Sequence, residues 1–263
     1  MFNLEGSMQK YVISLENAFD RRKHIESEFL KQDITFSFFD AILPDEATLL
    51  STELKLNIQD EFLSQTELAC LMSHVSLWKK VVDENIAYIA IFEDDIFLGE
   101  NAGKILNKTD WISSDLSIIK LEHFYSKVVL GRKVYSVTDT DRNIFELKGP
   151  NLGAAGYILS NEAAKKCIEY LEKSVAIPVD HLIFDKWIQE GLLKVHQINP
   201  AVCIQELSLG TTQKIKLESS LCDAREKRMR RHKKKGWSKF KNECRRIGRQ
   251  IKFALTQNSV YFK

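Results

Sequence analysis

The sequence predicts an α/β protein with a mixed, mostly parallel central sheet flanked by helices, ending in a basic helical tail. A strand–helix–strand pattern opens the chain, an apolar run at residues 87–92 is typical of a buried central strand, and Lys and Arg crowd residues 225–252. The chain has 263 residues, of which 44% are hydrophobic, and this is enough for one large core.

The opening pattern favours parallel strand pairing. Residues 9–15 form the first expected strand, residues 17–31 an amphipathic helix, and residues 34–39 a second strand rich in Phe. Strands joined by such a crossover helix usually run parallel in one sheet. The polar residues 44–60 then predict an excursion away from the sheet.

The clearest helix is expected at residues 64–84. Ser64 and Glu67 have the spacing of a capping box, and apolar residues recur three and four positions apart after them. We interpret Trp78 of this stripe as core material rather than as a surface for a sugar. The run from Ala87 to Phe92 then predicts a buried strand.

The remainder of the chain predicts shorter elements. Helices are expected at residues 161–173, with Asn161 as the N-cap, and at residues 180–190. Further strand candidates are residues 117–121, short segments within 127–148, and residues 155–159, 193–198 and 201–204.

Three segments are expected along the chain. Residues 1–7 end in Gly-Ser before a second Met and are interpreted as a cloning remnant, residues 8–222 as one domain, and residues 223–263 as a basic amphipathic tail. The five Cys are widely spaced without a CxxC pair, which favours reduced thiols in the cytoplasm over a disulfide framework or structural zinc. No stretch approaches the ~18 apolar residues of a membrane span.

Glu93, Asp94 and Asp95 follow the apolar run directly. Three adjacent carboxylates repel one another, and a divalent cation such as Mn²⁺ or Mg²⁺ reverses that repulsion. The triplet lies where open α/β sheets bind ligands, and a cation there can bridge two phosphate groups. The residue types alone fit a sugar-transfer enzyme, a phosphohydrolase or nucleotidyltransferase, or a solvated acidic turn.

Several stretches together resemble glycosyltransferase family 25, which includes bacterial lipooligosaccharide galactosyltransferases. The resemblance covers about residues 11–205, and the stretches that carry it are YVISL with Arg21-Arg22, FFDA at 38–41, TELACLMSHVSLWKK at 66–80, IFEDD at 91–95, GAAGYILS at 153–160 and PVDHLIFD at 178–185. Ala69 and Gly156 depart from the commoner family residues without touching a catalytic position.

The resemblance implies a GT-A-like fold, a nucleotide-sugar donor (commonly UDP-galactose), a Mn²⁺ or Mg²⁺ requirement and inversion at the anomeric carbon. Asp94 and Asp95 are expected to hold the metal. The residues expected to bind the donor are Ser14, Arg21, Arg22, Glu67, His74, Lys79, Glu93, Asp94 and Gln205. The two Arg side chains suit phosphate or a carboxylate, and His74 suits the nucleotide, the acidic loop or a purely structural position.

An inverting transfer needs a general base for the acceptor hydroxyl. Asp180 is the first candidate, Asp185 the second and Glu122 the third, although Asp180 could instead cap the helix that follows it. Asn151, Gly153 and Glu122 are expected on the acceptor side, because small residues let a backbone approach a sugar closely.

The basic segment, residues 225–252, holds fourteen Lys or Arg and two Glu, whereas the rest of the chain is acidic. Basic residues interleaved with large apolar ones suit an anionic membrane surface. We therefore expect a cytoplasmic enzyme on the inner face of the membrane, close to a lipid-anchored oligosaccharide acceptor. Nucleic-acid binding is the alternative use of these charges, but no nucleic-acid motif accompanies them.

Overall fold

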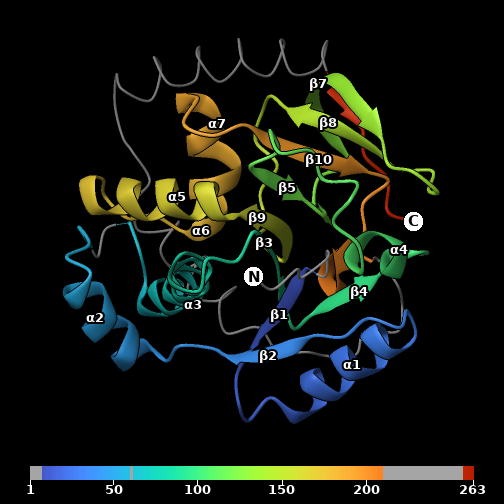
Figure 1. The fold of residues 1–263 in the computed structure, drawn as a ribbon. Coiled ribbons are helices and arrows are strands. Elements are labelled where there is room, and N and C mark those ends of the chain that lie inside the picture. Colours follow the sequence, from blue (N-terminus) through green and yellow to red (C-terminus); the bar gives the residue numbers. More distant parts are fainter. Residues whose placement is uncertain (1–7, 60–61, 210–256) are drawn as a thin grey trace, which may run out of the picture.

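The computed structural model describes residues 8–59, 62–209 and 257–263, which form a large mixed sheet with helices against both faces (Figure 1). The nine-stranded sheet has the order β12-β7-β8-β10-β5-β9-β3-β1-β2, and a smaller sheet has the order β4-β11-β6. The strands are β1 (Gln9–Ser14), β2 (Ser37–Asp40), β3 (Tyr88–Glu93), β4 (Ile96–Leu98), β5 (Ile118–Lys120), β6 (Glu122–His123), β7 (Lys127–Ser136), β8 (Asn143–Leu147), β9 (Gly156–Ser160), β10 (Val195–Asn199), β11 (Cys203–Gln205) and β12 (Gln257–Ser259).

The helices pack against the sheet from two sides and enclose two hydrophobic cores. One core lies under the long helix α3 and its neighbours, and the other under α1 and α4. The helices are α1 (Phe19–Leu30), α2 (Pro44–Glu53), α3 (Gln65–Asp83), α4 (Ala102–Leu106), α5 (Asn161–Lys173), α6 (Val179–His181), the π-helix η1 (Leu182–Lys186), α7 (Trp187–Glu190) and the 3₁₀ turn η2 (Glu206–Ser208).

The predicted α/β class and mixed sheet are confirmed. The opening strand–helix–strand unit pairs β1 in parallel with β2, and β3 lies parallel on its other side. The expectation that the sheet is mostly parallel is wrong, because antiparallel pairings outnumber parallel ones in the nine-stranded sheet. β9 enters antiparallel between β3 and β5, and β7 and β8 are joined by a short connection that permits only antiparallel pairing.

The capping box predicted for the long helix is confirmed. The Ser64 hydroxyl accepts from the Glu67 amide at 3.3 Å, and the Glu67 carboxylate accepts from the Ser64 amide at 2.9 Å. The N-cap predicted for α5 is one residue off, because the Ser160 hydroxyl accepts from the Ala163 amide at 3.2 Å. Asn161 instead donates to backbone carbonyls that end α3, and so ties the two helices together.

Two other segments differ from prediction. The polar stretch at residues 44–60 contains α2, which begins with Pro44 in its first turn, where a missing amide hydrogen does no harm. The helix expected at residues 180–190 is present as α6, η1 and α7, with one π-helical turn in its middle. π-Helical turns of this kind are often found at functional sites.

The last seven residues return to the sheet. β12 pairs antiparallel with β7, Val260 is 2% exposed, and the buried Arg142 donates to the Lys263 carbonyl oxygen at 2.7 Å. Residues 257–263 therefore belong to the folded domain, which corrects the tail boundaries of 223–263. The basic segment lies outside the described residues. None of the helices in the described ranges is long and apolar enough to cross a bilayer.

Candidate active site

The acidic triplet lies at the edge of the sheet where parallel strands end together. β3 ends at Glu93, β1 ends at Ser14 beside it, and Asp94 and Asp95 form the turn into β4. Because β1 and β3 run in the same direction, their carboxyl ends bring Ser14 next to a triplet 80 residues away in sequence.

Asp94 is held by two donors from the first strand–helix unit. The Ser14 hydroxyl donates to Asp94 Oδ2 at 2.7 Å, and Arg21 Nη1 donates to Oδ1 at 2.7 Å. Both carboxylate oxygens therefore have a donor within the protein, and Asp94 is nearly buried. The geometry gives Asp94 a role in fixing the turn, and leaves Glu93 and Asp95 as the carboxylates better placed to receive a cation.

The two adjacent Arg residues of α1 have different surroundings. Arg21 reaches the triplet, whereas Arg22 donates to the Ser14 and Leu15 carbonyl oxygens at 3.1 Å and pairs with Asp40 at the end of β2. Its guanidinium carbon also lies 4.7 Å from the centre of the Phe38 ring. Arg22 therefore braces the ends of β1 and β2.

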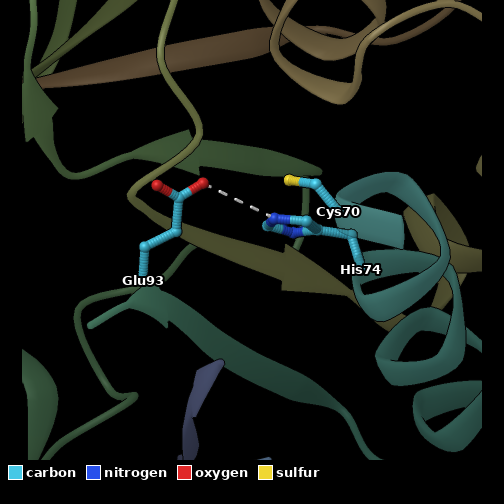
Figure 2. A group of neighbouring side chains, drawn as sticks. All are labelled: Cys70, His74 and Glu93. Atoms are coloured by element: carbon cyan, nitrogen blue, oxygen red, sulfur yellow. Dashed lines mark ion pairs between the residues drawn. The ribbon is translucent and has the colours of Figure 1, made fainter. Parts of the chain in front are cut away.

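His74 approaches the triplet from α3. Its Nε2 lies 3.9 Å from Glu93 Oε1 (Figure 2). Its Nδ1 lies 2.8 Å from the Tyr157 hydroxyl. Burial lowers the pKa of His74 to about 3, although the charge of Asp180 acts in the opposite direction, so the ring is neutral. Cys70, one helical turn away, joins His74 and Glu93 in a group whose potential ligand atoms all lie within 4.8 Å of one another.

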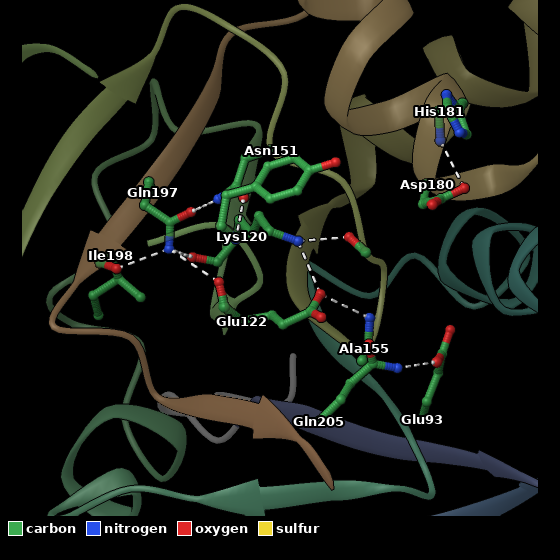
Figure 3. A network of polar contacts seen from close by, with 12 residues as sticks. Glu93, Lys120, Glu122, Asn151, Ala155, Asp180, His181, Gln197, Ile198 and Gln205 are labelled. Atoms are coloured by element: carbon green, nitrogen blue, oxygen red, sulfur yellow. Dashed lines mark hydrogen bonds and ion pairs between the residues drawn. The ribbon is translucent and has the colours of Figure 1, made fainter. Parts of the chain in front are cut away.

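Gln205, the last residue of β11, lies between two carboxylates. Its Nε2 is 3.2 Å from Glu93 Oε2 (Figure 3). The same nitrogen is 3.3 Å from each carboxylate oxygen of Asp95. Burial, followed by the charge of Asp94, raises the pKa of Glu93 to about 7, and burial, followed by the charge of Glu93, raises that of Asp95 to about 7. One neutral amide thus contacts both carboxylates, and the charge of Arg21 acts on both without offsetting the effect of burial.

The sequence reasoning missed Lys120, which is fully buried. Its Nζ donates to Glu122 Oε2 at 2.9 Å (Figure 3) and to the Gly153 carbonyl oxygen at 2.5 Å. The same nitrogen lies 4.1 Å from the centre of the Phe184 ring. Burial raises the pKa of Glu122 to about 7, against the lowering effect of Lys120. The available signal was a lysine and a glutamate two positions apart directly after an apolar run, although the structure places them at the end of β5 and the start of β6.

The residues expected on the acceptor side lie inside the protein. Asn151 is fully buried, donates to Gln197 Oε1 at 2.8 Å and accepts from the Tyr125 amide at 3.2 Å. Gly153 has φ of +82°, and a Cβ there would lie 2.5 Å from Glu122 Oε1. Asn151, Gly153 and Glu122 therefore belong to the buried structure that supports the acidic turn.

Asp180 lies in the first turn of α6, close enough to Glu93 for its charge to raise the pKa of that carboxyl. It is nearly buried, and its Oδ1 accepts from the His181 amide at 2.9 Å (Figure 3). The alternative that Asp180 caps the helix is wrong, because Pro178 occupies the N-cap. Asp185 accepts from Gln189 along the helix.

Two further residues expected to bind the donor have local roles in α3. Glu67 belongs to the capping box. Lys79 pairs with Asp83 at 3.6 Å, and its side chain is 46% exposed.

Comparisons with known proteins agree with this arrangement. Residues 8–183 match the family described as glycosyltransferase family 25 (LPS biosynthesis protein). The chain is 36% identical over 284 residues to the lipooligosaccharide biosynthesis protein lex-1 of Haemophilus influenzae, covering 96% of this chain and 93% of that protein. It is 37% identical over 213 residues to the lacto-N-neotetraose biosynthesis glycosyltransferase LgtE of Neisseria meningitidis serogroup B, covering 76% and 75%.

A third relative, the lipooligosaccharide biosynthesis protein lic2B of Haemophilus influenzae, is 39% identical over 237 residues and covers 86% of each chain. Among solved structures, apo mouse xyloside xylosyltransferase 1 superposes with a TM-score of 0.42 at 12% identity, covering 72% of this chain and 71% of that chain. That score is too low to support an argument about fold or function.

We predict that Asp95→Asn stabilises the metal-free protein more at pH 8 than at pH 5. Asp95 has a pKa of about 7 in the folded state, above its unfolded value of about 4, so it adds stability below about pH 4 that is lost as the pH rises through 7. Because an Asn side chain does not ionise, Asp95→Asn does not lose stability in this way as the pH rises. Urea unfolding in EDTA at both pH values measures the difference.

Asp110→Asn, at an exposed position, is the control and should show no such pH dependence. Adding Mn²⁺ at pH 8 should raise the urea midpoint of the wild-type protein but not that of Asp95→Asn, because only the former keeps the carboxylate. An equal stability difference at both pH values would show that Asp95 does not carry a raised pKa.

Proposed function

The chain belongs to glycosyltransferase family 25, and we propose that this glycosyltransferase moves galactose from UDP-galactose, with inversion, to a saccharide of lipooligosaccharide or lipopolysaccharide. The observation that carries the proposal is the acidic turn after β3, where Gln205 bridges Glu93 and Asp95 and where Arg21 lies alongside. The lipooligosaccharide acceptor is supported by what the relatives are named for.

The residues of this turn fit a divalent cation. Glu93 and Asp95 provide hard oxygen ligands with raised pKa values, and a cation would replace the proton that each otherwise tends to keep. Gln205 could turn its amide oxygen toward the same ion, since its nitrogen and oxygen ends exchange by rotation. Bound Mn²⁺ or Mg²⁺ would act as a Lewis acid that stabilises negative charge on the departing diphosphate.

The remaining residues of the turn prepare it for the donor. Ser14 and Arg21 hold Asp94, so the turn keeps its shape when an anionic diphosphate approaches. Arg21 also supplies positive charge beside the acidic turn, and a guanidinium is suited to phosphate. These contacts support a site prepared for a nucleotide diphosphate.

Asp180 is the proposed general base. In an inverting transfer the acceptor oxygen bonds to the anomeric carbon while the bond to the diphosphate breaks, and the hydroxyl proton passes to a base on the acceptor side. Asp180 comes from the helical segment, whereas the acidic turn comes from the sheet, so the two carboxylate groups can face a sugar from different sides. The GT-A-like character of the fold is part of the same proposal.

The rival functions receive less support. A phosphohydrolase or nucleotidyltransferase could use the same carboxylates. However, the matching family and the three named relatives are all described as glycosyltransferases or as proteins of lipooligosaccharide or LPS biosynthesis. Nucleic-acid binding would depend on residues 225–252, outside the described residues.

We predict that the protein releases UDP from UDP-galactose in the presence of Mn²⁺, and far more slowly with EDTA. UDP-glucose and UDP-N-acetylglucosamine, tested in the same assay, define the sugar preference. Mass spectrometry of a soluble oligosaccharide acceptor should show the added hexose. Release of inorganic phosphate or joining of a nucleotide, with no hexose transferred, would replace this proposal with one of its rivals.

We predict that Asp180→Asn lowers kcat by about 100-fold or more, because a carboxamide cannot accept the acceptor proton. KM for the donor should change little, since the acidic turn is intact. Asp185→Asn is the matched control, because Asp185 contacts Gln189 on the same helical segment. A larger loss in Asp185→Asn than in Asp180→Asn would transfer the role of base to Asp185.

We predict that replacing the Lys and Arg residues of 225–252 with Gln weakens sedimentation with anionic liposomes. Each basic residue near such a surface contributes about 1 kcal/mol, and neutral liposomes serve as the control. Substitution is preferable to truncation because residues 257–263 belong to the sheet. Turnover on a soluble acceptor should remain, and unchanged sedimentation would contradict peripheral membrane binding.

A further inference from the structure

Tyr157 lies in β9 and contacts two side chains of α3 through its hydroxyl group. Trp78 Nε1 is 2.9 Å from the hydroxyl oxygen, and His74 Nδ1 is 2.8 Å from it. All three side chains are fully buried, and the two helix residues share a face because they are four positions apart. The His74 and Tyr157 rings also stack, with their centres 5.7 Å apart.

The chemistry of the three groups sets the direction of each hydrogen bond. An indole N–H can only donate, so the Tyr157 oxygen accepts from Trp78. A tyrosine hydroxyl has one hydrogen, and His74 Nδ1, 2.8 Å away, is the acceptor to which it can be directed. An imidazole that accepts at Nδ1 is neutral and carries its own hydrogen on Nε2.

The Nε2–H of His74 faces Glu93. Nε2 lies 3.9 Å from Glu93 Oε1 and has no hydrogen-bond partner among the residues that the structure describes (Figure 2). A contact of this length is common in a ligand-free active site and tightens when the substrate binds. The other oxygen of Glu93 receives Gln205, so two neutral donors flank this carboxylate.

We infer that Tyr157 is a positioning residue that holds His74 in its Nε2–H form and thereby aims a neutral hydrogen-bond donor at Glu93. A neutral donor orients the carboxylate without cancelling the negative charge that a cation and its diphosphate would use. The kinetic consequence rests on the proposed function, whereas the form of the His74 ring does not depend on any substrate.

The first experiment removes one oxygen atom. Tyr157→Phe should lower kcat and weaken the apparent affinity for Mn²⁺, each by about 10-fold, as is usual when a group that orients a ligand is lost. KM for the acceptor should stay unchanged. Tyr135→Phe is the matched control, because the Tyr135 hydroxyl also donates a hydrogen bond, to the Trp111 carbonyl oxygen at 2.8 Å, in a different part of the sheet.

The second experiment observes the ring directly. NMR of ¹⁵N-labelled histidine in the full chain, with His74→Gln used to assign one of six His, should show the Nε2–H form in the wild type and a shift toward Nδ1–H in Tyr157→Phe. His74→Gln should retain more activity than His74→Ala, because the Gln amide can place a donor near the Nε2 position.

Two results would overturn the inference. One is full kcat and Mn²⁺ affinity in folded Tyr157→Phe, and the other is an Nδ1–H ring in the wild type, a measurement that holds even where the variant does not fold. An Nε2–H ring in a protein that transfers no sugar from any donor supports the positioning role and contradicts the proposed function instead.

Discussion

The candidate site depends on the repulsion among carboxylates gathered at the end of β3. Glu93, Asp94 and Asp95 are consecutive and partly or wholly buried, and this burial, together with repulsion from the neighbouring carboxylates, raises the pKa of the two outer groups to about 7. The surrounding protein offsets this repulsion unevenly. Arg21 provides a full positive charge to Asp94, while Gln205 provides only an amide dipole to the outer pair. The proposed cation would supply the positive charge that the two outer carboxylates still need.

A buried ion pair lies close to the acidic turn. Lys120 and Glu122 are both fully buried, and each would be strongly destabilising without its partner. Lys120 also contacts the Gly153 carbonyl oxygen and the ring of Phe184, which belongs to the helical segment that begins just before Asp180. The pair therefore joins the sheet, the glycine-containing loop and the helix that presents the proposed base. This explains how a lysine remains in so apolar a position.

Local patterns in the sequence were sufficient for much of the fold. The capping box of α3, the buried strand β3 and the acidic turn after it depend on residues within one segment, so their spacing identifies them. The direction of β9 and the return of residues 257–263 to the sheet depend on partners distant in the chain, which periodicity does not encode. The different contacts of Arg21 and Arg22 could not be predicted for the same reason. Two adjacent, chemically identical residues differ only in what the fold places beside them.

The antiparallel strand β9 lies between β3, which leads into the acidic turn, and β5, which ends at Lys120. Tyr157 lies in register with Ile91 of β3 on one side and with Lys120 of β5 on the other, so a single residue position spans the acidic turn and the buried Lys120–Glu122 pair. The neighbouring Gly156 has a related function, since a Cβ there would lie 2.3 Å from the sulfur of Cys203. Its missing side chain lets β11 approach closely enough for Gln205 to reach the acidic turn.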